Sequence, residues 1–188
     1  MMLSVIEKVG IAFSANISNE ITSDKIDMMN ISHFLKKDKD FSVSSKSIEA
    51  RGMGRLLVGS FEDIIINYVR YVKERLQLED NWLIVSLILF ERVLLRKRLE
   101  SKMVLEFHKA IPLILVCIIV SSKLMEDVAI YVDDFVEQLH LLNLNKYSLL
   151  KLEADVIQNF LNFNVFVKEE TFKTYVHTLN HSLAEVRR

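Results

Sequence analysis

Residues that interrupt regular structure are scarce in this chain of 188 residues, which contains one proline and four glycines. Sandwiches and barrels of β-strands need many tight turns, and such turns are built largely from glycine and proline. So few turn residues argue against a fold of that kind. The composition favours an all-α domain, and the chain is long enough to bury a sizeable core without disulfides.

Cysteine and excess charge are also scarce. Cys117 is the one cysteine, so it cannot form an internal disulfide, which fits a reducing compartment. The net charge is −1, so no global field draws the chain toward nucleic acid or an anionic membrane. The N-terminus has no basic segment followed by an apolar stretch and a cleavage site, and we see no secretory signal. We therefore expect a cytoplasmic or nuclear location and no nucleic-acid partner.

Motifs for catalysis and for metal binding are missing from the sequence. It has no G-x-S-x-G, H-E-x-x-H or P-loop pattern, so it predicts no catalytic residue, no cofactor and no small-molecule substrate. His177 and His181 are four residues apart and would share one helix face. Two zinc ligands require such a face, but further ligands are not evident, so we predict no metal site.

The stretch Ile111–Asp127 is the most informative part of the chain, because it contains the apolar run from Ala110 to Val120. A helix that is apolar all round belongs at the centre of a bundle or in a membrane. A membrane span needs about 20 apolar residues, and this run ends well short of that, so we expect no membrane span. We predict a central core helix with Pro112 in its first turn, where the missing N–H is not needed. Its polar end, which includes Lys123, would meet solvent or a partner.

Amphipathic helices are predicted on both sides of this core helix. Ser60 and Asp63 form a capping-box pattern, in which the serine accepts the free amide groups of a first helical turn. Beyond it, hydrophobic residues recur at helical spacing in successive segments. The predicted helices cover residues 60–75, 82–95, 132–142, 146–161 and 169–183. We thus expect five core helices with flanking helices, in a domain over residues 60–188. Residues 1–59 are predicted to be an N-terminal extension, partly helical or loop.

Three segments in this order resemble a known fold. They are SLILFERVLL at Ser86–Leu95, SSKLMED at the end of the core helix, and LEADVIQNFLNFNV at Leu152–Val165. Together they resemble the cyclin box, and the branch they look most like includes the Y-type and phosphate-pathway (P-type) cyclins. The resemblance covers roughly Ser60 to Leu179. It implies a single five-helix cyclin box.

The resemblance implies a regulatory subunit that binds a cyclin-dependent protein kinase and has no catalytic activity of its own. Such a subunit holds the mobile regulatory helix of the kinase inward, so that the kinase can grip its ATP phosphates. The residues that match the kinase-binding positions of the family are Lys123, Leu124, Glu126, Glu153 and Ile157. Glu91 matches an acidic position of the family that usually belongs to a buried structural ion pair, and we predict that Glu91 and Arg92 form a structural ion pair.

One spacing departs from the family pattern. The family glutamate usually precedes an exit phenylalanine by nine positions, whereas Glu153 precedes Phe163 by ten positions. Either this helix contains a one-residue bulge, or Ala154 stands where the glutamate should be. The irregularity motivates an alternative function, in which a cyclin-fold adaptor binds a protein partner without activating a kinase.

Overall fold

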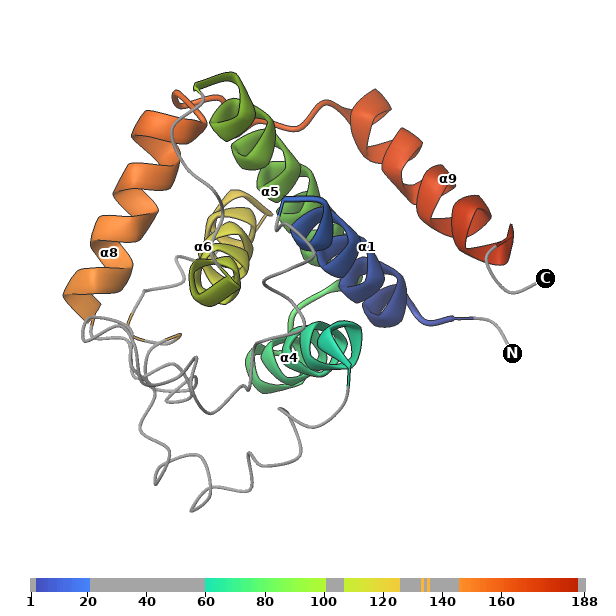
Figure 1. Ribbon diagram of the computed structural model, residues 1–188. Coiled ribbons are helices and arrows are strands. Elements are labelled where there is room, and N and C mark those ends of the chain that lie inside the picture. The colour runs from blue at the N-terminus through green and yellow to red at the C-terminus, as the bar shows by residue number, and fades with distance from the viewer. Residues whose placement is uncertain are drawn as a thin grey trace, which may run out of the picture.

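The computed structural model describes residues 3–20, 60–100, 107–125, 133, 135 and 146–185. These residues form six α-helices and one π-helical turn, and no strand occurs among them. The all-α class predicted from the scarcity of turn residues is confirmed. The elements are α1 (Val5–Glu20), α4 (Phe61–Leu76), α5 (Asp80–Glu100), α6 (Phe107–Met125), α8 (Lys146–Asp155), the π turn η4 (Val156–Phe160) and α9 (Glu169–Glu185) (Figure 1).

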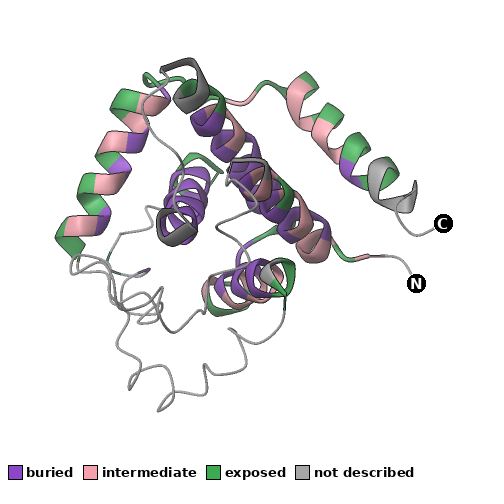
Figure 2. Cartoon of the chain, in the orientation of Figure 1, coloured by how far each residue is buried: buried purple, intermediate pink, exposed green. Residues whose placement is uncertain are grey.

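Helix α6 is the central helix that the apolar stretch predicts. Residues 110–122 are all buried, and Figure 2 shows the helix in the buried colour over most of its length. The hydroxyls of Ser121 and Ser122 donate hydrogen bonds of 2.8 Å to the carbonyls of Ile118 and Ile119. These two buried polar groups are therefore satisfied within the helix. The core continues to the last turn before the chain meets solvent at Lys123.

The beginning of α6 differs from the expectation. The helix begins at Phe107, so Pro112 lies in its second turn rather than in its first. A proline at that place cannot donate to the carbonyl four residues earlier, and one helical hydrogen bond is missing there. Sequence reasoning put the start too late because it followed the apolar run, and the helix extends beyond that run.

Helices α5, α4 and α1 pack around this axis. Helix α5 lies along α6 and also contacts α1, where Phe13 and Phe90 meet edge to face with their ring centroids 5.1 Å apart. Gly10 of α1 lies against Ile66 of α4 so closely that an added Cβ would stand 2.9 Å from the Ile66 Cα. The glycine thus permits close packing of two helix backbones and does not interrupt α1.

The N-terminus of α4 has the predicted capping box. The Ser60 hydroxyl accepts a hydrogen bond from the Asp63 N–H at 3.2 Å, and the Asp63 carboxylate accepts one from the Ser60 N–H at 2.9 Å. These two bonds satisfy amide groups that a helix N-terminus leaves unpaired. At the other end, Gln77 adopts the left-handed conformation with φ 52°. The chain then turns into α5.

The C-terminal elements lie at opposite edges of the bundle in Figure 1. Helix α8 packs against α6, whereas α9 packs against α5 and α1. The Lys8 Nζ of α1 donates a hydrogen bond of 2.6 Å to the Asn180 side-chain oxygen of α9. Between these elements, the link of residues 161–168 crosses from the α8 side to the α9 side. This link borders the candidate site.

Some of the predicted features lie outside the described residues. They are the helix at 132–142, apart from Asp133 and Phe135, and residues 21–59 of the predicted N-terminal extension. None of the described helices combines the length and the apolar character that a membrane span requires.

Candidate protein-binding site

Lys123 and Glu153 meet where α6 emerges from the core. The Lys123 Nζ lies 2.5 Å from the Glu153 Oε1, although 30 positions separate the two residues in the sequence. The glutamate side chain is 9% exposed and the lysine side chain 34%. A carboxylate removed from water needs a partner, so Glu153 holds the lysine in place. The lysine side chain remains partly accessible at the surface.

Apolar side chains surround this ion pair. Leu124 is 44% exposed, and Met125, which the sequence analysis did not single out, is 47% exposed. Ile157 is half-buried and packs against the core from the π turn. The surface thus combines one oriented cation with accessible apolar groups. Glu126, the remaining residue predicted for this site, lies outside the described residues.

A π turn accounts for the additional residue in this helix. Over Val156–Phe160 the helix widens, and the N–H of Leu161 donates to the carbonyl of Val156, five residues earlier, at 2.9 Å. A single turn of this kind accommodates one extra residue in an α-helix, and such turns are frequent at functional sites.

The π turn decides between the two readings of the spacing. It lies after Glu153, so the glutamate stays in register with the core and faces Lys123. Ala154 is exposed and does not take its place. The one-residue bulge is therefore the reading that the structure supports.

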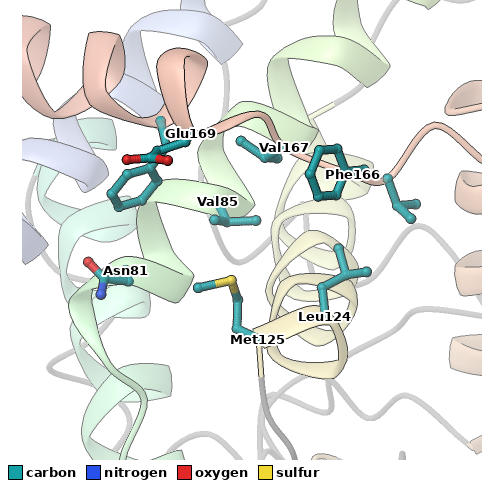
Figure 3. A pocket seen from close by; sticks show the side chains of 9 residues that line it. Asn81, Val85, Leu124, Met125, Phe166, Val167 and Glu169 are labelled. Carbon is teal, nitrogen blue, oxygen red and sulfur yellow. The ribbon is translucent and has the colours of Figure 1, made fainter.

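An apolar groove lies beside the ion pair. Its volume is about 370 Å³, and Figure 3 shows its lining residues. Leu124 and Met125 come from the end of α6, and the link contributes Val165, Phe166 and Val167. The other side is formed by Asn81 and Val85 of α5 and by Glu169 and Phe172 of α9. Leu124 belongs both to the groove and to the surroundings of the ion pair.

Two phenylalanines of the link are largely exposed, and the sequence predicted a site role for neither. Phe163 is 67% exposed with φ 59°, and Phe166 is 74% exposed. A bulky residue in the left-handed region costs about 1–2 kcal/mol. Neither exposed ring contributes much to the hydrophobic core. Exposure cannot be read from the sequence alone, because these rings lie in a short apolar segment that could equally be buried.

Glu91 and Arg92 have separate partners in the structure. Glu91 accepts a hydrogen bond from the Asn16 amide of α1 at 2.8 Å and another from the hydroxyl of Tyr175. Arg92 donates from Nη1 to two carbonyls of the link. Consecutive residues on a helix do not face each other, which explains why the two charges point to different neighbours. Glu91 connects α5 with α1 and α9, whereas Arg92 connects α5 with the link, so the described contacts do not pair these two charges with each other.

His177, His181 and Cys117 are the remaining candidates for chemistry. The rings of His177 and His181 lie 4.1 Å apart on exposed positions of α9. Among the described residues, no group of three or more histidine, cysteine or acidic side chains could hold a metal ion. Burial raises the pKa of the Cys117 thiol well above its ordinary value. An inaccessible, protonated thiol is a poor nucleophile and a poor metal ligand.

Comparison with known proteins assigns the family. The family model of the cyclin N-terminal domain matches residues 29–166, which is most of the chain. The helical architecture agrees with this match. The chain belongs to the cyclin family. No curated protein and no solved structure shows a significant match.

Proposed function

We propose that this protein is the regulatory subunit of a cyclin-dependent protein kinase, which it binds through Lys123 and the surface around it. The proposal depends chiefly on one observation, the contact of 2.5 Å between Lys123 and the buried Glu153 at the exposed end of the core helix. The family assignment supports it, since cyclins are generally regulators of such kinases. Within the family, the residues still resemble the Y-type and P-type cyclins most, and this narrower assignment is also a proposal.

The ion pair is suited to recognition of a protein backbone. A lysine ammonium has three N–H donors, and Glu153 accepts one of them. The others can donate to carbonyls of a partner, and the buried carboxylate has already ordered the side chain. A pre-ordered donor loses less entropy on binding than a free lysine does. Leu124 and Ile157 would add apolar contacts to the same partner.

The rigid bundle would regulate the kinase only by holding a kinase helix in a fixed position. Residues 110–122 are buried, so Lys123 is attached to a helix that cannot shift without disturbing the core. A partner helix held against this end would keep a defined place. Holding the regulatory helix of a kinase inward lets the kinase pair its own lysine and glutamate around ATP. This function requires no cofactor, and we place it in the cytoplasm or the nucleus.

A matched pair of double variants tests the proposal. Lys123→Met/Glu153→Gln removes both charges together, so no buried carboxylate is left unpaired. Lys146→Met/Asp133→Asn removes a second ion pair, which is also 2.5 Å long but joins two exposed side chains, Lys146 at the start of α8 and Asp133 before it. We expect the first variant to weaken binding to a responsive member of a panel of purified cyclin-dependent kinases by about 30-fold or more. We expect the second to leave binding unchanged.

Two outcomes would count against the proposal. Equal loss of binding in both variants would indicate a general charge effect, and no binding by the unaltered chain to any kinase of the panel would oppose kinase recognition itself. Phosphorylation of a generic substrate by the complex separates activation from an adaptor function. An adaptor would bind the kinase and leave its rate unchanged.

A further inference from the structure

The backbone of the link is tied to α5 by the side chain of Arg92. The Nη1 atom of Arg92 donates hydrogen bonds to the carbonyls of Asn164 and Phe166, at 3.1 and 2.9 Å. The first carbonyl belongs to the peptide plane before Val165, and the second belongs to the plane after Phe166. The two bonds therefore restrict the backbone dihedrals of both intervening residues.

The position of Phe166 depends on this backbone. Its side chain is 74% exposed, so packing against the core does little to hold the ring. The direction in which the side chain leaves the chain is then set by the backbone dihedrals. Because Arg92 restricts these dihedrals, it also determines where the exposed ring stands on the surface.

The beginning of the link adopts a conformation that has to be enforced. Asn162 and Phe163 both lie in the left-handed region, with φ values of 46° and 59°. This region is unfavourable for a phenylalanine, and such residues persist where the surrounding structure holds them. The N–H of Phe163 donates to the carbonyl of Ile157 at 2.9 Å. The link is thus tied at two points, first to the π turn and then, through Arg92, to α5.

We propose that Arg92 is a positioning residue for partner binding, which orders the link so that Phe166 is presented to the kinase that binds Lys123. This role rests on the proposed function and adds to it a half-buried residue that acts through the link. Phe166 lines the groove together with Leu124, which also lies beside the ion pair, so a partner seated on Lys123 reaches the link. A segment that is already ordered loses less entropy on binding than a mobile one.

The order of the link is measured first, on the free chain. Arg92→Met removes the donors and keeps an apolar side chain. Arg70→Met is the matched control, because Arg70 is also half-buried but bonds to Asn67 on its own helix, α4. Hydrogen exchange followed by mass spectrometry should be about fivefold faster over residues 161–168 in Arg92→Met and unchanged in Arg70→Met. Arg92→Lys keeps a cation with three N–H donors and should lie between the two. Unchanged exchange in Arg92→Met would overturn the assignment.

The affinity for a responsive kinase of the panel is measured second. We expect Arg92→Met to weaken binding by about tenfold, since the partner then has to order the link, and Arg70→Met to leave it unchanged. Phe166→Ala should weaken binding to a similar extent. Adding Arg92→Met to Phe166→Ala should cost about twofold at most, because the ring that Arg92 positions is then absent. Two losses that multiply in full would show that Arg92 acts independently of Phe166 and would overturn the assignment.

Two outcomes separate this role from the proposed function. Absence of binding by the unaltered chain to every kinase of the panel would oppose the proposed function itself. A kinase that requires Lys123 and binds Arg92→Met as tightly as the unaltered chain would leave the proposed function standing. That second result would overturn only the positioning role of Arg92.

Discussion

The hydroxyl of Tyr175 on α9 donates a hydrogen bond to the carboxylate of Glu91 on α5. Asn16 of α1 donates to the same carboxylate, so one acidic side chain on α5 links the first and the last described helices, α1 and α9. Burial raises the pKa of the Tyr175 hydroxyl, and the hydrogen bond to Glu91 raises it further. The phenol therefore stays a neutral donor at physiological pH.

Replacement of this donor should loosen α9. We expect Tyr175→Phe to lower the free energy of unfolding by about 1–2 kcal/mol, because Glu91 loses one of its two donors while half-buried. Chemical denaturation followed by circular dichroism measures the change. Tyr147→Phe is the control, since Tyr147 is largely exposed and should lose almost nothing. Equal effects of the two substitutions would contradict a role for the Tyr175 hydroxyl.

Gly10 is predicted to be necessary for the contact between α1 and α4. A Cβ at this position would lie 2.7 Å from the Ile66 Cγ1 and 2.9 Å from its Cα, and the backbone atom cannot rotate away. We expect Gly10→Ala to destabilise the protein by about 1–3 kcal/mol through overpacking, although alanine favours a helix by about 1 kcal/mol. Ala15→Gly, on an exposed position of the same helix, measures the helix propensity alone. A net gain in stability for Gly10→Ala would show that the helices separate easily.

Stability at acidic pH should depend on the capping box of α4. Hydrogen bonds from Ser60 lower the pKa of Asp63 from its ordinary value of 3.8. A carboxyl with a depressed folded-state pKa adds stability above its unfolded pKa, and this contribution is lost as the pH falls through the folded value. The contribution of Asp63 should thus be complete at neutral pH and should decline as the pH falls below 3.8. Thermal melts at stepped pH values should show a smaller acid-induced decline for Asp63→Asn, and an unchanged decline would refute the assignment.

Cys117 should be unreactive in the folded protein. Its side chain is fully buried in α6, and burial raises the thiol pKa. A protonated and inaccessible thiol does not attack a disulfide reagent. We expect negligible labelling by Ellman's reagent under native conditions and rapid labelling in denaturant. Rapid native labelling would show that α6 opens readily, which contradicts a rigid central helix.

Much of the fold can be predicted from local patterns. The apolar run of α6, the capping box at Ser60 and the helical spacing in α4 and α8 depend on neighbouring residues, and the structure confirms them. The start of α6 was misplaced because its first turn is outside the apolar run. The packing function of Gly10 depends on Ile66, a residue of another helix, and no local pattern indicates it.

The candidate site was only partly predictable. The match to SSKLMED and the later L-E pair suggested Lys123 and Glu153, and the structure brings these two residues into contact. The partners of Arg92 are carbonyls 72 and 74 positions away in a segment without regular structure. Such contacts arise from the tertiary fold, and neither periodicity nor composition indicates them. The groove beside Phe166 could therefore not be predicted.

The most direct test of the central claim exchanges the two charges of the ion pair. Lys123→Glu and Glu153→Lys should each lower the free energy of unfolding by about 2 kcal/mol, less than for a fully buried pair because Lys123 is partly exposed. The double variant restores opposite charges, and we expect most of the stability to return. Binding to the kinase should not return, because the cation then lies on α8 and not at the end of α6. A double variant that regains both stability and kinase affinity would show that Lys123 is only structural and would contradict this account.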